Sequence, residues 1–257
     1  MSLTFKGAGG STSAHTNISK KINVLSSESS FWMREAYNSL RTNVTFSLTE
    51  QGCKVIGVTS SIASEGKSSV SLNLAISFSE TKSRVLIIDA DMRLPKLAMT
   101  LGYNLAPGLS DILVNQADLK QAIVKTNNEF LDFLPAGKIP PNPSELLLSE
   151  HFVDMIQMLK SDYDYIIIDT PPVTVVSDAV IISRVLSGVL LVARCNAVDK
   201  RAVEGAVNQL TFANAKILGY VFNDAPIESK SRYSSHYSTY GSYQNASAYA
   251  DTHGAVK

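Results

Sequence analysis

Residues 55–78 read VIGVTSSIASEGKSSVSLNLAISF, and this stretch decides the fold. An apolar, β-branched run ends in a loop of small residues, a Gly-Lys-Ser-Ser follows, and apolar positions then continue for the length of a helix. Strand, loop, Gly-Lys-Ser and helix in this order is the arrangement of a phosphate-binding loop. Backbone N–H groups and the positive end of the helix dipole would face the phosphates there. We therefore expect nucleotide binding by Ser64, Glu65, Gly66, Lys67, Ser68 and Ser69.

The lysine and the first serine of this loop predict specific chemistry. Lys67 would reach the β- and γ-phosphates as a point charge, and the Ser68 hydroxyl would ligate Mg²⁺. The match to the pattern GxxxxGK[ST] is incomplete, because Ser61 stands where the pattern has its first glycine. Serine tolerates a positive φ angle less well than glycine does. A Gly-Lys-Ser after a strand is compatible with chance on its own, so other parts of the chain have to support it.

Two further apolar runs end in aspartates. Residues 84–89 (RVLIID) lead into Asp89 and Asp91, and residues 165–169 (YIIID) end in Asp169 before Thr-Pro-Pro. Such runs are typical of buried parallel strands, whose carboxyl ends form the edge of the sheet where ligands bind. Asp169 would hold Mg²⁺ through a water molecule, as in a Walker B motif. For Asp89 and Asp91, a metal-binding or proton-accepting role is favoured over structural capping, because the pair lies beside a phosphate loop.

Strand and helix patterns alternate along most of the chain. Strands are expected at 54–59, 84–89, 130–135, 165–169, 188–194 and 217–223. Helices are expected at 31–48, 67–80, 151–160, 178–186 and 199–213, with short helices within 97–128 and another helix after the proline-rich residues 138–143. This alternation predicts an α/β fold in which helices flank a parallel β-sheet.

Composition limits the possible functions. The chain has 257 residues, of which 45% are hydrophobic and 18% are charged, as in ordinary globular proteins. The formal net charge is zero, so no bulk attraction to nucleic acid is expected. The sequence contains no apolar run long enough to span a membrane, and its N-terminus lacks the core of a signal peptide. Cys53 and Cys195 suggest reduced thiols in a cytoplasmic protein.

The two ends of the chain differ from its middle. Residues 1–30 are rich in Ser, Gly, Thr, Lys and Asn, which predicts a flexible N-terminal tail, whereas residues 31–226 would form the folded domain. Residues 227–257 have almost no aliphatic side chains and are expected to be disordered. Five of the ten tyrosines of the chain lie in this segment. Sticky aromatic contacts are one interpretation, but an ATP site on the same chain favours phosphoryl acceptors: Tyr233, Tyr237, Tyr240, Tyr243 and Tyr249.

Together these residues resemble the bacterial tyrosine kinases of capsule and exopolysaccharide export, which descend from the MinD/ParA branch of P-loop ATPases. SSIASEGKSS (60–69) resembles the Walker A motif of that family, DADMR (89–93) its Walker A′ motif and IIIDTPP (166–172) its Walker B motif. EAYNSLRTN (35–43) resembles the N-terminal self-association helix, and LPAGKIPPNPSELL (134–147) is similar to a stretch typical of the family. The resemblance runs from residue 31 to the C-terminus.

The resemblance implies a protein-tyrosine autokinase that uses ATP and Mg²⁺ to regulate capsular or exopolysaccharide synthesis and export. Without a transmembrane segment, the chain is similar to the split, Gram-positive-type cytoplasmic subunit. In that form a transmembrane polysaccharide co-polymerase acts as a separate adaptor, which activates the kinase and recruits it to the inner face of the membrane. The acceptor segment is close enough in sequence to act in cis, but the resemblance implies a ring of subunits, with Glu35 and Arg41 in the contact and phosphorylation of the tyrosine cluster in trans. A cognate tyrosine phosphatase is a further implied partner.

The same resemblance implies roles for the strand-end residues. Asp89 would take the proton of the incoming tyrosine hydroxyl, although the choice between Asp89 and Asp91 as the base stays open. Mg²⁺ would be placed by Ser68 together with Asp91 and Asp169. Arg93 would contact phosphate or an adjacent subunit.

Three positions complete these expectations. Asn223, at the end of the last strand, is a candidate contact to the nucleobase. Asn38 replaces the middle arginine of the Glu-x-x-Arg-x-x-Arg helix motif, which bears on the strength of ring assembly. Ser64 stands where the family's Walker A motif carries glycine, which bears on loop geometry.

The competing interpretation is a MinD/ParA-like ATPase switch that phosphorylates nothing. Those proteins carry a signature lysine five residues before the P-loop lysine, and Ile62 occupies that position here. They also often end in a basic amphipathic helix, whereas this chain ends in tyrosines. A catalytically inactive scaffold is a third interpretation, which rests only on Ser64 and Asn38.

Overall fold

A computed structural model describes residues 22–225. Residues 1–21 and the tyrosine-rich residues 227–257 lie outside the described residues. The predictions of disorder and of acceptor tyrosines in the C-terminal segment therefore stay predictions.

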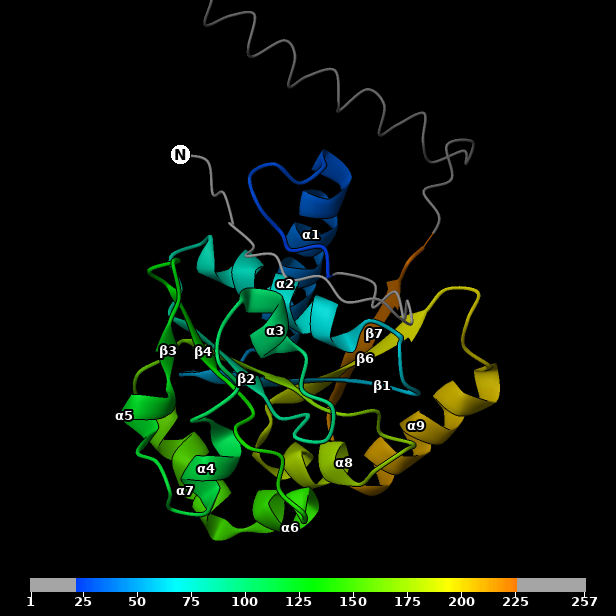
Figure 1. Cartoon of the computed structure of the whole chain (residues 1–257). Helices are drawn as coiled ribbons and strands as arrows, with labels where there is room; N and C mark the ends of the chain where they lie inside the picture. The colour runs from blue at the N-terminus through cyan, green and yellow to red at the C-terminus, as the bar shows by residue number, and fades with distance from the viewer. Residues whose placement is uncertain (1–21, 226–257) are drawn as a thin grey trace, which may run out of the picture.

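The described part of the chain forms one seven-stranded sheet. Its strands are β1 (Lys54–Ser60), β2 (Val85–Asp89), β3 (Val124–Lys125), β4 (Leu131–Leu134), β5 (Tyr165–Asp169), β6 (Gly188–Arg194) and β7 (Ile217–Asn223). Their order in space is β3-β4-β2-β5-β1-β6-β7, and every neighbouring pair is parallel except β3 with β4 (Figure 1). The predicted α/β fold with a parallel sheet is confirmed. The edge strand β3 was not predicted, because two residues are too few to show a periodic pattern.

Nine α-helices lie in the described residues. They are α1 (Phe31–Ser47), α2 (Lys67–Ser79), α3 (Leu97–Leu101), α4 (Leu109–Leu113), α5 (Leu119–Ala122), α6 (Pro143–Leu148), α7 (Glu150–Leu159), α8 (Asp178–Ile182) and α9 (Lys200–Phe212). Several begin where the sequence supplies a cap: Ser149 accepts a hydrogen bond from the backbone N–H of Phe152, and Asp199 accepts one from Arg201. The helix expected over 178–186 is α8 followed by a short 3-10 turn at Ser183–Val185.

Both faces of the sheet are covered. Helices α1, α2 and α3 lie on one face, and α4 to α9 lie on the other (Figure 1). Successive residues of β2 enter the two layers alternately, with Ile87 in the core beneath α2 and with Leu86 and Ile88 in the core beneath α7. Burial on both faces explains why the strands read as continuous apolar runs in the sequence.

Residues 22–30 belong to the folded part of the chain, which corrects the predicted end of the N-terminal tail. They were expected to belong to the flexible tail of residues 1–30, but Leu25 is only 4% exposed. Its backbone N–H donates to Asn73 Oδ1 on α2 at 2.8 Å, and Asn73 Nδ2 donates to the Asn23 carbonyl at 2.9 Å. A single amide side chain of α2 therefore binds this segment by both of its polar atoms.

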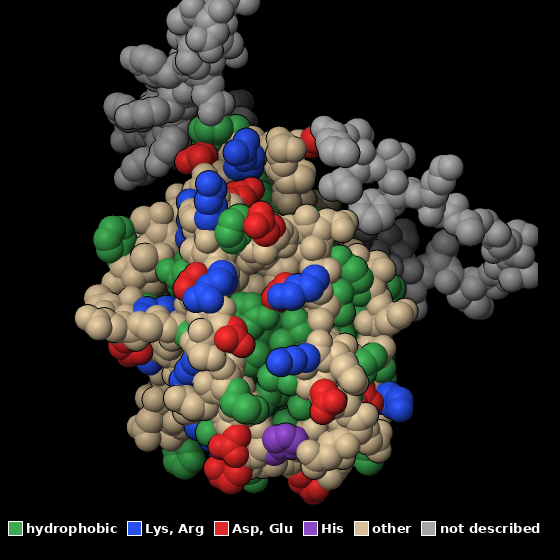
Figure 2. Space-filling model, turned by 90° about the vertical axis from the view of Figure 1, so that its left-hand side faces the viewer, with side chains coloured by type: hydrophobic (Ala, Val, Ile, Leu, Met, Phe, Trp, Pro, Cys, Tyr) green, Lys and Arg blue, Asp and Glu red, His purple; other side chains and the backbone are tan. Residues whose placement is uncertain are grey.

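The surface shows no strong separation of charge on the face seen in Figure 2. Acidic and basic side chains are interspersed there, and apolar side chains gather between them. Cys53 and Cys195 are free and half-buried. Among the described helices, none combines the length and the apolar character that crossing a bilayer requires.

Candidate active site

The phosphate loop connects β1 to α2, and two of its residues have positive φ angles. Gly66, the N-cap of α2, has φ 94°, and Ser64 has φ 68°. A Cβ atom on Gly66 would lie 1.9 Å from Asn223 Nδ2, so both the backbone conformation and the available space require glycine. Ser64 shows that the loop keeps a left-handed turn at the position where the resemblance led us to expect glycine.

The side chains of Glu65 and Asn223 stabilise this loop through hydrogen bonds. Glu65 is 2% exposed, and its carboxylate accepts hydrogen bonds from the backbone N–H groups of Ile62 at 2.8 Å and Arg194 at 3.3 Å. Asn223 Nδ2 donates to the Glu65 carbonyl at 2.9 Å. The structure thus places Asn223 against the phosphate loop itself. The Glu65 carboxylate is already hydrogen-bonded to backbone N–H groups of the same chain. A phosphate would therefore be bound by the backbone of the loop and not by the Glu65 side chain.

Lys67 lies between the carboxylates of two strand ends. Its Nζ is 2.8 Å from Asp91 Oδ2, 3.6 Å from Asp169 Oδ2 and 3.4 Å from Ser68 Oγ. Asp169 and Asp89 are directly opposite each other in the pairing of β5 with β2, and β5 is also paired with β1. The three predicted motifs therefore meet at one edge because their strands are neighbours in the sheet.

The aspartates have different surroundings. Asp89 is fully buried, and its two oxygens accept from the backbone N–H groups of Asp91 at 3.2 Å and Leu97 at 3.1 Å. Asp91 accepts from the Leu94 N–H at 3.1 Å through one oxygen and from Lys67 through the other. Asp89 thus makes the capping contacts that the sequence left as an alternative, whereas Asp91 presents an oxygen to the lysine.

These surroundings change the proton affinities of the cluster. Burial, followed by the charge of Asp169, raises the pKa of Asp89 to about 8. Burial also raises the pKa of Asp169. Burial alone would lower the pKa of Lys67, but the charges of Asp169 and Asp91 outweigh it and raise that pKa. The lysine therefore stays charged, and the Asp89 carboxyl keeps its proton well above the pH at which an aspartate ordinarily ionises.

The donor set fits a magnesium ion that is shared with a nucleotide. Asp169 Oδ2 is buried and has no hydrogen-bond partner among the described residues, whereas Ser71 Oγ donates to the other oxygen at 3.0 Å. No group of three or more His, Cys, Asp or Glu side chains in the described residues could enclose a metal ion without other ligands. Mg²⁺ is usually held by one or two carboxylates together with phosphates and water. Asp169, Asp91 and the Ser68 hydroxyl suit that kind of site.

Comparison with known proteins identifies the family. A family model described as an AAA domain matches residues 53–217. The putative tyrosine-protein kinase CapB of Staphylococcus aureus is 36% identical over 203 residues, which make up 79% of this chain and 89% of CapB. The chain belongs to the bacterial tyrosine-protein kinases. The family suggested by the sequence motifs is confirmed.

Solved structures agree with this assignment. The kinase domain of the Escherichia coli tyrosine kinase ETK is 30% identical to this kinase and has a TM-score of 0.73, with 77% of this chain and 78% of that chain covered. MinD of Pyrococcus horikoshii, solved with Mg-ADP, is 25% identical and has a TM-score of 0.56, with coverage of 66% and 70%. The predicted P-loop NTPase fold of the MinD/ParA branch is therefore confirmed.

The kinase carries its expected self-association residues on α1. Glu35 is exposed, and it accepts a hydrogen bond at 3.1 Å from Asn38, the residue that replaces the middle arginine of the family motif. Arg41 donates from one guanidinium nitrogen to Ser77 O at 2.6 Å and Ser77 Oγ at 2.9 Å. Arg41 thus ties α1 to α2 within its own chain, which the sequence did not reveal.

Arg93 makes contacts that differ from the expected ones. Its guanidinium donates to both oxygens of Asp178, at 2.8 and 3.1 Å, and to Ser144 Oγ at 2.8 Å. Ser144 Oγ in turn donates to Asp178 at 2.6 Å, and Asp178 is fully buried. Arg93 therefore joins the loop after β2 to the starts of α6 and α8, and it is not directed at Lys67.

Sequence reasoning missed Asp178 and Ser144. Asp178 is the first residue of α8, so in the sequence it looks like an ordinary acidic residue in a first helical turn.

Of the remaining predicted residues, Ser69 is half-buried in the first turn of α2, and the five acceptor tyrosines lie outside the described residues.

Proposed function

We propose that the chain is an ATP-dependent protein-tyrosine kinase that phosphorylates its own tyrosine cluster, residues 233–249. The observation that carries the proposal is the cluster of Lys67, Asp91 and Asp169 beside a phosphate loop, in a chain that covers most of the length of a relative named as a tyrosine-protein kinase. The MinD/ParA-like ATPase switch lacks a comparable observation.

The residues of the site suggest a division of labour. The amides of the phosphate loop and Lys67 would neutralise the β- and γ-phosphates of ATP. Mg²⁺, when bound through Ser68, Asp91 and Asp169, would add positive charge where the phosphates meet. To accept these ligands, Lys67 would turn from Asp91 toward the phosphates.

Phosphoryl transfer from ATP to tyrosine forms one bond, breaks one bond and moves one proton. The tyrosine oxygen forms a bond to the γ-phosphorus as the bond to the bridging oxygen of ADP breaks, and the hydroxyl proton passes to a carboxylate. Asp89 and Asp91 are the candidate bases. The raised pKa of Asp89 makes its carboxylate a strong base once it has lost its own proton, whereas Asp91 is less deeply buried and better placed to contact a substrate.

The cellular setting follows from the resemblance and belongs to the proposal. The kinase would act in the cytoplasm at the inner face of the membrane, recruited and activated by a transmembrane polysaccharide co-polymerase. Subunits would associate through α1, including Glu35, and phosphorylate one another's tails. A tyrosine phosphatase would reverse the reaction, and the cycle would regulate capsular or exopolysaccharide synthesis and export.

The test is mass spectrometry of the purified full chain after incubation with ATP and Mg²⁺, with and without the cytoplasmic peptide of the adaptor. The wild type, Lys67→Met and a control, Lys120→Met on α5, would be compared. We expect phosphate on the tyrosines between 233 and 249 in the wild type and in the control, and none in Lys67→Met. ATP hydrolysis without phosphotyrosine, even with the adaptor peptide, would refute the kinase and favour the ATPase switch.

A further inference from the structure

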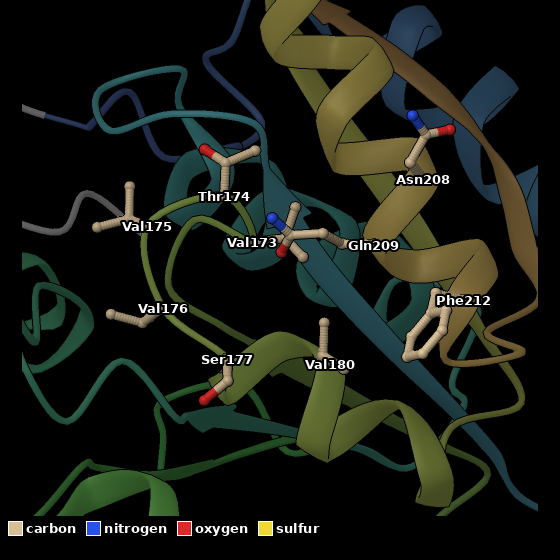
Figure 3. Close-up of a pocket in the computed structure, with 9 residues that line it drawn as sticks. All are labelled: Val173, Thr174, Val175, Val176, Ser177, Val180, Asn208, Gln209 and Phe212. Atoms are coloured by element: carbon tan, nitrogen blue, oxygen red, sulfur yellow. The ribbon is translucent and has the colours of Figure 1, made fainter.

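A groove runs between α8 and α9 on the side of the sheet opposite α2, and it takes no part in the site described above. Its volume is about 530 Å³. Figure 3 shows Val180 on α8 and Phe212 on α9 at opposite sides of the hollow, with Val173 and Val175 in the segment that follows β5. The groove is therefore bordered mainly by apolar side chains from three segments.

The lining of this α8/α9 groove has two unusual properties. Phe212 is 90% exposed and Val175 is 63% exposed, although both are large apolar residues. The nine lining residues, all in the described part of the chain, include no charged side chain. Exposed apolar patches of this kind mark interaction sites. The occupant should therefore be aromatic or aliphatic, and it should carry no charge.

One end of the groove is attached to the phosphate loop. Thr174 Oγ1 donates to the Ser61 carbonyl at 2.5 Å, and the Val173 N–H donates to the Ser60 carbonyl at 2.9 Å. Both hydrogen bonds join the segment after β5 to the start of the loop that would hold ATP. The Val173 end of the groove therefore lies beside the start of the phosphate loop.

The sequence contains a segment with the required composition. Residues 233–250 carry five tyrosines and no Asp, Glu, Lys or Arg. They begin eight residues after Ala225, where the described chain ends just beyond β7. Eight residues span up to about 28 Å when extended, and β7 is the neighbour of β6, on which α9 packs through Leu210. The segment is thus long enough to reach the groove of its own chain.

We propose that residues 233–250 dock in the α8/α9 groove of the same chain when their tyrosines are unphosphorylated. A tyrosine ring would pack between Val180 and Phe212, and its hydroxyl would pair with the amide of Asn208 or Gln209. Docking would hold the unmodified acceptors on their own chain, away from the neighbouring subunit that would phosphorylate them.

Phosphorylation would end this docking, and this step rests on the proposed function. Each phosphoryl group transferred from ATP adds a charge of about −1.5 to −2. None of the described residues that line the groove is cationic and could pair with this charge, so burying the modified side chain becomes unfavourable. The product of the reaction would therefore leave the groove.

Photo-crosslinking in the full chain tests the docking. p-Benzoyl-phenylalanine would replace Phe212, and in separate preparations Val175 or Phe46, an exposed aromatic residue on α1 that serves as the control. The protein would be dephosphorylated and free of nucleotide, as an equal mixture of ¹⁴N and ¹⁵N chains. Thermal unfolding would verify that each variant is folded. We expect crosslinks from positions 212 and 175 to residues 233–250 within single chains, at a yield at least fivefold above that from position 46.

Three results would overturn the inference. These are no crosslink to residues 233–250 from either groove position, a yield equal to that of the control, or crosslinks that join ¹⁴N to ¹⁵N chains, which would assign the groove to a second copy. Incubation with ATP and Mg²⁺ before illumination should lower the yield at least fivefold, and an unchanged yield on phosphorylated chains would refute the release. Because the docking experiment needs no nucleotide, failure of the kinase proposal would leave its result interpretable.

Discussion

At the scale of single residues, Asp178 has the clearest role that the sequence concealed. It is fully buried and receives hydrogen bonds from both Arg93 and Ser144. Removing one partner of a buried ion pair is costly because the other charge is left unpaired. Arg93 is 37% exposed in this pair, so water compensates part of the loss.

We therefore expect Asp178→Asn to lower the free energy of unfolding by about 1–2 kcal/mol. Kinase activity should fall as well, because Arg93 follows Asp91 by two residues. Urea unfolding of Asp178→Asn, Arg93→Ala and the double variant would measure the coupling. Strictly additive effects of the two substitutions would contradict a direct interaction.

The buried carboxyl of Asp89 predicts a dependence of stability on pH. Its pKa is raised from 3.8 to about 8 in the folded chain, so the native state holds a proton that the unfolded state has lost across this range. The free energy of unfolding should therefore fall as pH rises from about 4 to about 8 and then level off, with a slope of up to about 1.4 kcal/mol per pH unit.

Replacing Asp89 with asparagine tests this dependence, because the amide cannot titrate. Denaturant unfolding between pH 5 and 8, in the presence of a chelator, should give a flatter profile for Asp89→Asn than for the wild type. Asp154→Asn, which changes an exposed residue on α7, serves as the control and should keep the wild-type slope. Parallel profiles for all three proteins would show that Asp89 is ionised throughout.

At the scale of the elements, the contact between the phosphate loop and the end of β7 can be tested by substituting glycine residues. Gly66 has φ 94° and no room for a Cβ, whereas Gly52 has φ 82° and a Cβ there would meet none of the described residues within 4 Å. Gly52→Ala should cost about 1 kcal/mol from backbone strain alone. Gly66→Ala should cost clearly more and should weaken nucleotide binding. Equal changes in thermal stability for the two variants would show that the contact with Asn223 is unimportant.

The elements also show what could be predicted and what could not. Asp89, Asp91 and Asp169 were placed at one edge from the sequence because parallel strands share their carboxyl edge, and this rule needs no tertiary information. The pair of Arg93 and Asp178 spans 85 residues, and no local pattern reports such a contact. The contact of Leu25 with α2 was missed as well, because the apolar residues Ile22, Val24 and Leu25 form a group too short to show a periodic pattern.

At the scale of the whole molecule, the balance of charge predicts how phosphorylation will appear. The unmodified chain has a formal net charge of zero. Phosphate on all five clustered tyrosines would bring the chain to roughly −7.5 to −10, because each group adds about −1.5 to −2. Native isoelectric focusing after incubation with ATP and Mg²⁺ should resolve up to five new acidic bands. Lys67→Met should stay in one band, and acidic bands in that variant would indicate another kinase in the preparation.

The contact of Asn223 with the phosphate loop also orders events during synthesis of the chain. A ribosome would complete the loop, both aspartate motifs and six of the seven strands before it reached residue 223. Only then would the side chain that bonds to Glu65 become available. The tyrosines of residues 233–249 are translated after Asn223. The acceptors would therefore leave the ribosome only after the side chain that completes the contacts of the phosphate loop.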